Sequence, residues 1–163
     1  MERPRNSPGP DSAATIVAIS ISTAGIPKRN VEQVEVTADG LVGDQHAHEK
    51  HRRAYRAVSV QDVELLDQLV AEGHAVGPGI MGENLTVRGL DVQRLAVGDR
   101  LLLDHGPVLE LTEPRRPCYV LDAVHPRLQE AAVGRCGYLC RVIRTGMCRL
   151  GQSITVSRSS PDR

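Results

Sequence analysis

The sequence predicts one mainly β domain with one or two packed α-helices. Its 163 residues are a typical length for a single domain, and its 19 valines favour β-strands. Phe and Trp are absent, so the core has to be aliphatic. Short apolar runs separated by turn residues are typical of a barrel or of two packed sheets. We expect strands at 15–22, 31–36, 84–87, 100–103, 108–112, 138–145 and 153–156.

One helix is clearly indicated in the middle of the chain. Ser59 and Asp62 fit the pattern of a capping box, and Gly73 provides a stop. Between them, apolar residues recur at helical spacing, namely Val63, Leu66 and Val70. A second, shorter helix is predicted to begin at Cys118, just after a proline.

Composition excludes two large classes of function. Lys and Arg number 20, as do Asp and Glu, so no excess of positive charge is available to bind nucleic acid. The aromatic residues are Tyr55, Tyr119 and Tyr138, too few for a platform that stacks bases. No apolar run reaches the roughly 18–20 residues that a membrane helix needs. We therefore expect that the protein neither binds nucleic acid nor inserts into a membrane.

The two ends of the chain are polar and contain Pro and Ser. We expect residues 1–12 and 157–163 to be disordered tails around one domain at 13–156. The first tail lacks the apolar stretch of a secretory signal. Four cysteines without such a signal predict a reducing compartment, and hence a cytoplasmic protein.

Cys118 is the strongest candidate for a chemically active residue. It ends the segment Glu113-Pro114-Arg115-Arg116-Pro117-Cys118, where a predicted strand gives way to a loop. The guanidinium groups of Arg115 and Arg116, and a helix N-terminus if one begins here, would lower the pKa of the thiol. The thiolate is the form that attacks sulfur or binds a metal. A buried cysteine beside two solvated arginines is the alternative.

The segment Gly134-Arg135-Cys136-Gly137 is the second candidate. Its glycines allow a sharp turn or a close backbone approach, and Arg135 is a natural donor to phosphate or carboxylate. The four cysteines could together bind zinc, but the chain has one C-x3-C pair where structural zinc sites usually have two C-x2-4-C pairs. We favour a packing role for Cys140 and Cys148.

Two further segments carry polar groups that allow more than one interpretation. The run from His46 to His51 holds common metal ligands, but basic residues follow it. A metal site, an anion site and a solvated polar loop are all interpretations, and we favour the loop. Asn84 stands where a glycine-rich run enters a strand, and it could hold either a ligand or its own turn.

Taken together, these segments resemble the MOSC domain, named for the C-terminal domain of molybdenum cofactor sulfurase. The resemblance covers residues 14–156 and is closest to the small stand-alone bacterial members of the family. It rests on short motifs in the family's order: GLVGD at 40–44 with His46, AVSV at 57–60, GENLTV at 82–87, LAVGD at 95–99, LELT at 109–112 with PRRPC at 114–118, GRCG at 134–137, and RV at 141–142.

The resemblance implies a MOSC-type β-barrel, similar to the pyruvate-kinase barrel, with flanking helices. It also implies that Cys118 receives sulfur as a persulfide from a pyridoxal-phosphate cysteine desulfurase and passes it to a molybdenum enzyme or its cofactor. In other members of the family, this cysteine binds the molybdenum–pterin cofactor. Asn84, Arg115 and Arg135 match positions expected near the pocket. His46 and His51 are further candidate contacts to a cofactor.

Three functions are consistent with these expectations. The leading one is a sulfur carrier linked to the molybdenum cofactor and acting through Cys118. The second is a molybdenum–pterin oxidoreductase that reduces N-hydroxylated compounds, with Cys118 as metal ligand. The third is a non-catalytic module that binds an anion or a partner protein. No covalent pyridoxal phosphate is expected, because the only lysines, Lys28 and Lys50, lie in predicted loops.

Overall fold

Short strands rich in Val, Ile and Leu close into a barrel in this computed structural model, which describes residues 13–23, 26–44 and 54–160. Neighbouring strands follow the order β11-β7-β8-β9-β5-β6-β1, and β1 pairs back onto β11 to give a seven-stranded ring. The prediction of a mainly β barrel is confirmed. The barrel strands are β1 (Ala14–Ile21), β5 (Val58–Asp62), β6 (Leu85–Arg88), β7 (Arg100–Leu103), β8 (Val108–Pro114), β9 (Tyr138–Arg144) and β11 (Ser153–Ser157).

Alternating burial along the strands explains why the barrel forms. In β7, Leu101 and Leu103 are buried while Arg100 and Leu102 are exposed, so one face of the strand packs inward. Strand β5 is buried at every position, because the barrel interior lies on one side and other elements cover the other. The core of the barrel is aliphatic, as its composition requires.

A smaller sheet packs beside the barrel. Its strands are β3 (Gln33–Thr37), β4 (Gly40–Leu41) and β10 (Gly146–Arg149), in the order β10-β3-β4, and the short strand β2 (Arg29–Val31) extends the barrel sheet at β1. Buried Val34, Val36 and Cys148 connect this sheet to the barrel core. The sequence did not predict β10 or β4.

Helix α1 (Val63–Ala71) follows β5 directly and leads to β6, which pairs parallel with β5. Gly73 lies just after the helix with a φ of 98°, so the predicted stop is confirmed. The predicted capping box is wrong. Ser59 lies inside β5, and Asp62, although it is the N-cap residue, makes no side-chain capping bond and instead accepts a hydrogen bond from the Val92 amide at 3.0 Å.

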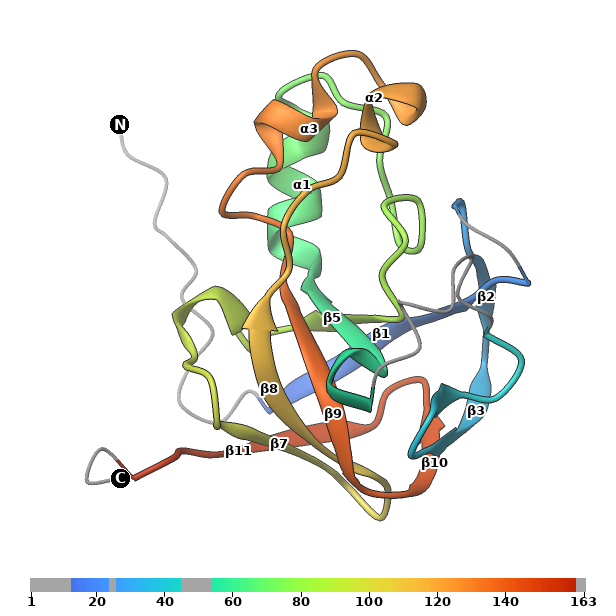
Figure 1. The fold of residues 1–163 in the computed structure, drawn as a ribbon, viewed down its shortest axis with the longest axis vertical. Coiled ribbons are helices and arrows are strands. Elements are labelled where there is room, and N and C mark those ends of the chain that lie inside the picture. Colours follow the sequence, from blue (N-terminus) through green and yellow to red (C-terminus); the bar gives the residue numbers. More distant parts are fainter. Residues whose placement is uncertain (1–12, 24–25, 45–53, 161–163) are drawn as a thin grey trace.

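Two short helices, α2 (Leu121–Val124) and α3 (Leu128–Ala131), gather with α1 beyond one end of the barrel (Figure 1). The helix predicted to begin at Cys118 therefore begins three residues later, after a turn in which the Leu121 amide donates to the Cys118 carbonyl at 3.0 Å. A second core holds this helical layer together. Its buried members are Leu66, Leu69, Met81, Leu121, Leu128, Ala132 and Cys136.

Two short 3-10 helices, Ala54–Arg56 and Val92–Arg94, complete the described elements. Hydrogen bonds to the barrel extend beyond residue 156, where the domain was predicted to end. The Ser159 amide and hydroxyl donate to Asp99 Oδ1 at 2.8 and 3.1 Å. Within the described residues, no helix is both long and apolar enough to span a bilayer.

Candidate functional site

Cys118 lies in the irregular segment between the end of β8 and the start of α2, and its side chain is exposed. The alternative of a buried Cys118 is therefore wrong. The other three cysteines are buried, Cys140 and Cys148 in the barrel core and Cys136 in the helical layer. This separation excludes a site in which all four thiols bind one zinc ion. Burial raises the pKa of Cys140 and raises that of Cys148 to about 12, which fits the packing role.

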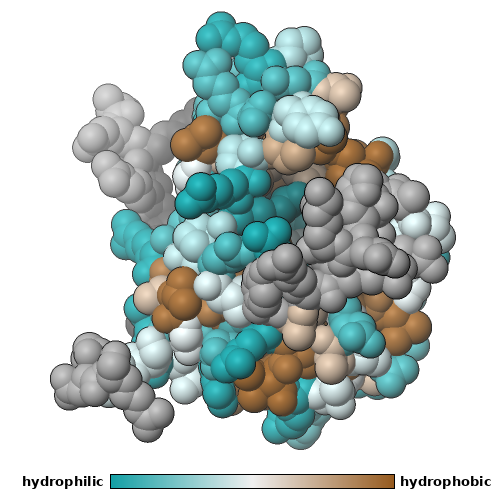
Figure 2. All heavy atoms as spheres, in the orientation of Figure 1, coloured by the Kyte–Doolittle hydropathy of each residue, from teal (hydrophilic) through white to brown (hydrophobic). Residues whose placement is uncertain are grey.

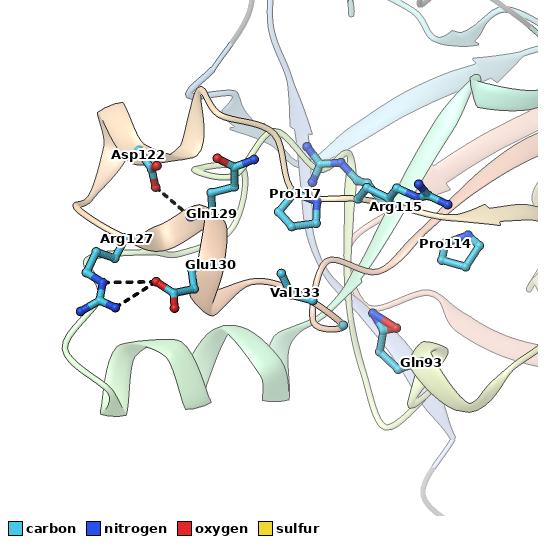
Figure 3. Close-up of a pocket in the computed structure, with 11 residues that line it drawn as sticks. Gln93, Pro114, Arg115, Pro117, Asp122, Arg127, Gln129, Glu130 and Val133 are labelled. Atoms are coloured by element: carbon cyan, nitrogen blue, oxygen red, sulfur yellow. Dashed lines mark hydrogen bonds and ion pairs between the residues drawn. The ribbon is translucent and has the colours of Figure 1, made fainter.

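A pocket of about 720 Å³ lies beside the Cys118 segment. The end of β8 and the residues after it form one wall, and α2, α3 and the chain that follows form the other (Figure 3). Arg116 and Pro117, the two residues before Cys118, line it. The full lining is Gln93, Pro114, Arg115, Arg116, Pro117, Asp122, Arg127, Gln129, Glu130, Val133 and Gly134. At the helical end of the molecule the visible surface is mainly hydrophilic (Figure 2).

Arg115 is fixed by the interior of the helical layer. Its amide donates to the Gly137 carbonyl at 2.9 Å, and its Nη2 donates to the Met81 carbonyl at 2.6 Å. Its Nη1 lies 3.9 Å from the Sγ of Cys136. Among the described residues, no hydrogen bond joins Arg115 or Arg116 to the Cys118 thiol. The structure therefore turns Arg115 towards Cys136, and not towards the cysteine that the sequence pattern paired with it.

Cys136 and Glu83 share this interior. Burial raises the pKa of the Cys136 thiol, although the Arg115 guanidinium opposes the effect. Glu83 is fully buried, and its Oε1 accepts a hydrogen bond from the Gly79 amide at 2.5 Å. Its Oε2 has no hydrogen-bond partner among the described residues, and burial raises its pKa. Sequence analysis missed Glu83, whose one signal was a charged residue at the entrance to a buried strand.

Asn84 has its side chain fully engaged inside the protein. Its Oδ1 accepts from the amide and the hydroxyl of Ser59 at 3.0 and 3.3 Å. Its Nδ2 donates to the Ser20 carbonyl at 3.2 Å and to Asp44 Oδ2 at 2.9 Å. A direct contact to a ligand stays a prediction. The observed bonds give Asn84 a positioning role between β1, β5 and Asp44.

Asp44 is in turn paired with the half-buried Lys28. The Lys28 Nζ donates to both carboxylate oxygens at 2.7 and 2.8 Å, and the side chains are 9% and 2% exposed. The Ser22 amide also donates to Asp44, at 2.9 Å. The ammonium of Lys28 is thus held in an ion pair. The other lysine, Lys50, and the candidate contacts His46 and His51 lie outside the described residues.

The Arg135 side chain binds other residues of the helical layer and does not line the pocket. Its guanidinium forms a bidentate ion pair with Glu72, at the end of α1, with one of the two bonds at 2.8 Å. The Nε and Nη2 groups also donate to the Ala131 carbonyl at 2.9 and 2.7 Å. The expectation that Arg135 directly binds a phosphate is therefore not supported by its observed contacts. It connects α3 to α1.

The fold and the site define a class of protein: a β-barrel domain with an exposed cysteine directly after a segment that lines a pocket with a helical wall. The chain belongs to the MOSC domain family, whose model matches residues 44–155. The resemblance read from the motifs is thereby confirmed. Family membership indicates a function associated with the molybdenum cofactor.

Relatives and solved structures agree with this assignment. The chain is 29% identical over 144 residues to a protein named "Reductase" from Gibberella moniliformis, and the match covers 83% of this chain and 26% of the relative. The chain thus spans about a quarter of the length of that curated relative. The YuaD protein of Bacillus subtilis has a similar fold, with a TM-score of 0.77, 20% identity, and coverage of 91% of this chain and 98% of that one. YiiM from Escherichia coli gives a TM-score of 0.70, 22% identity, and coverage of 91% and 72%.

Proposed function

We propose that this protein is a sulfur carrier linked to the molybdenum cofactor, and that Cys118 holds the sulfur. The observation that carries the proposal is the exposure of Cys118, which directly follows the pocket-lining residues Arg116 and Pro117, while the three other thiols are buried. An exposed thiol can reach a cysteine residue of another protein, which a buried thiol cannot. The donor we propose is a pyridoxal-phosphate cysteine desulfurase, and the acceptor is a molybdenum enzyme or its cofactor.

Loading of Cys118 is a sulfur transfer between two thiols. The Cys118 thiolate attacks the outer sulfur of a persulfide on the donor enzyme, forming one S–S bond as the donor's S–S bond breaks. The donor leaves as a thiolate, and Cys118 becomes a persulfide. The step needs no oxidant, because the oxidised sulfur arrives with the donor.

The pocket contains groups that fit a phosphorylated cofactor at this site. Arg115 and Arg116 line it, and no hydrogen bond or ion pair within the described chain engages the Arg116 guanidinium. Guanidinium groups suit phosphate, and a cysteine thiolate is a soft ligand for a metal. Arg116 would hold the phosphate and Cys118 the metal, while Asn84 and Arg135 position the surrounding elements. When bound, the molybdenum–pterin cofactor supplies redox chemistry at the metal.

Persulfide loading is tested by intact mass spectrometry. The protein is incubated with a purified cysteine desulfurase and isotopically labelled cysteine. We expect a mass gain of one sulfur atom on the natural chain, and its loss on treatment with a thiol reductant. Cys118→Ala removes the gain, whereas Cys148→Ala, which deletes a buried thiol, keeps it. No gain on the natural chain, or an equal gain on Cys118→Ala, contradicts the proposal.

A second candidate is a molybdenum–pterin oxidoreductase acting on N-hydroxylated compounds, with Cys118 as the metal ligand. The relative named "Reductase" favours it. Elemental analysis distinguishes the two candidates. Molybdenum retained at one atom per chain through purification, and lost in Cys118→Ala, favours the oxidoreductase. Persulfide loading of metal-free protein favours the carrier.

A further inference from the structure

Two histidines outside the Cys118 segment face each other in the helical layer. The Nδ1 atoms of His74 and His125 lie 2.9 Å apart, with ring centroids at 4.9 Å and rings nearly perpendicular at 85°. Both residues are half-buried. At this separation one Nδ1 carries a proton and donates to the other, which is unprotonated. Metal binding by the pair has no further support, since no group of three or more such ligands occurs among the described residues.

The backbone fixes each imidazole to a helix. The His74 amide donates to the Leu69 carbonyl at 3.0 Å, at the end of α1. The His125 amide donates to the Leu121 carbonyl at 3.2 Å, and its own carbonyl accepts from the Leu128 amide at 3.1 Å. The imidazole pair therefore connects the end of α1 to the junction of α2 and α3.

That junction supports one wall of the pocket. The lining residues from this wall are Asp122, Arg127, Gln129, Glu130, Val133 and Gly134. Helices α2 and α3 have four residues each, too short to be stable without tertiary contacts. The position of the wall therefore depends on contacts such as the imidazole pair, the Arg135–Glu72 ion pair and the buried Leu121 and Leu128.

We propose that His74 and His125 form a pH-sensitive latch that holds the α2–α3 wall of the pocket and releases it on acidification. The latch acts on the segment that begins at Cys118, whether that segment carries sulfur, binds a cofactor or does neither. It therefore does not depend on the function proposed above.

Three protonation states of the pair explain the release. With both imidazoles neutral, one Nδ1–H donates to the other Nδ1. With one imidazole protonated, the bond persists and is assisted by charge. With both protonated, two donors of like charge face each other at the distance of a hydrogen bond, and the contact breaks. Because the two imidazoles share one hydrogen bond, release accompanies protonation of the second imidazole.

Charged groups on the elements that carry the pair are already engaged in bonds of their own. Glu72, just after α1, interacts electrostatically with His74, and its hydrogen bond with Arg135 lowers the pKa of its carboxyl, so it stays ionised. From α2, Asp122 accepts a hydrogen bond from the Gln129 amide at 3.0 Å. From the α3 side, Arg127 and Glu130 pair with each other at 3.0 Å. The change on acidification is thus assigned to the imidazoles.

Hydrogen exchange on the full chain, read by mass spectrometry, tests the latch. Amides are compared at about pH 7.5 and about pH 5.5, after correction for the intrinsic exchange rate. We expect amides in 118–134 to lose protection about tenfold at the lower pH, in keeping with loss of one good hydrogen bond. Amides in β7 and β8 serve as the internal reference and keep their protection.

His74→Asn provides the matched variant. An asparagine oxygen accepts from the Nδ1–H of His125 whether or not that imidazole is protonated, so the contact no longer titrates. We expect 118–134 to stay protected at both pH values, and His125→Asn to behave in the same way. Asp62 is present in all variants, so its protonation contributes equally to each of them. Unchanged protection in the natural chain, or an equal loss in both variants, overturns the proposal.

Discussion

The Asn84 side chain joins segments that are distant in the sequence. Its amide connects Ser59 in β5, Ser20 in β1 and Asp44 after β4 through bonds of 2.9 to 3.3 Å. It is 2% exposed, so water cannot replace a lost partner. A hydrophobic side chain there would leave several buried polar groups unpaired, and such groups are costly.

Asn84→Ala tests this positioning role. We expect the free energy of unfolding to fall by about 2–4 kcal/mol, because buried partners lose their bonds and a small cavity opens. Urea unfolding followed by circular dichroism measures the change. The control is Asn30→Ala, which removes an exposed asparagine whose Oδ1 accepts one bond from the Ser20 hydroxyl. We expect that change to cost less than about 1 kcal/mol. Equal losses would argue that Asn84 is not a structural link.

At the scale of single residues, the sequence located Cys118 but not the groups around it. The PRRPC motif placed an accessible thiol at the end of a strand, and the structure agrees. The role of Arg135 could not be predicted, because its partner Glu72 lies 63 residues away and only folding brings them together. Arg115 was assigned to the wrong thiol for the same reason. Nearness in the chain suggested Cys118, whereas the fold places Cys136 beside it.

The GRCG turn at residues 134–137 leads into strand β9, and its glycines shape the start of that strand. Its two glycines have positive φ values, 72° at Gly134 and 78° at Gly137, but for different reasons. A Cβ on Gly134 would meet nothing within 4 Å. A Cβ on Gly137 would clash with the Val60 carbonyl oxygen of β5, which is backbone and cannot move aside. Gly137 thus allows the start of β9 to approach β5 closely, whereas Gly134 serves only the turn.

Gly137→Ala and Gly134→Ala form a matched pair that separates these roles. We expect Gly134→Ala to destabilise the protein by about 1 kcal/mol, the usual cost of a left-handed alanine. Gly137→Ala adds a backbone clash, and we expect a loss of more than about 3 kcal/mol, or failure to fold. Thermal and urea unfolding of both variants measures the difference. Similar losses in the two variants would mean that β5 and β9 are not in the close contact described.

Helices and strands were predictable to different degrees. Alternating apolar residues predicted most of the barrel strands, because a strand with one buried face has an apolar residue at every second position. The short strands β4 and β10 carry too few residues for a pattern, and they form because β3 lies between them. Helix α3, with four residues, is likewise too short to be predicted from a pattern of apolar residues. The capping-box pattern at Ser59 led to a wrong prediction, because Ser59 lies in β5 and hydrogen-bonds with Asn84.

For the molecule as a whole, carboxyl groups that are buried or partly buried give opposing dependences of stability on pH. Burial tends to raise the pKa of Asp99, but bonds from Ala96 and Ser159 outweigh it and leave the pKa lowered. Glu110 behaves alike, with Arg100 and Arg141 as partners. Their stabilisation is present above the ordinary carboxyl range and is lost as pH falls below it. Asp62 has the opposite sign, since burial raises its pKa from 3.8 to about 6.

The folded state therefore binds a proton at Asp62 more tightly than the unfolded state does. Its contribution to stability is complete below about pH 4 and is lost as pH rises through about 6, for a total of about 2–3 kcal/mol. The carboxylate is 1% exposed, and its Oδ2 has no partner among the described residues, so the ionised form lacks compensation. Above neutral pH, Asp62 is ionised in the folded state, and its buried charge lowers the free energy of unfolding.

Asp62→Asn removes the titration while keeping an oxygen for the Val92 amide. Relative to the natural chain, we expect the free energy of unfolding of the variant to increase by about 2 kcal/mol between about pH 4.5 and about pH 7.5, which is most of the total. Urea unfolding at intervals across that range measures it. Asp67→Asn, on the exposed face of α1, should leave the natural pH dependence nearly unchanged. Because both curves are referred to the natural chain at each pH, the histidines and the paired carboxylates cancel. Parallel curves for Asp62→Asn and the natural chain would show that Asp62 is already ionised at the acidic end, and that the barrel accommodates its charge.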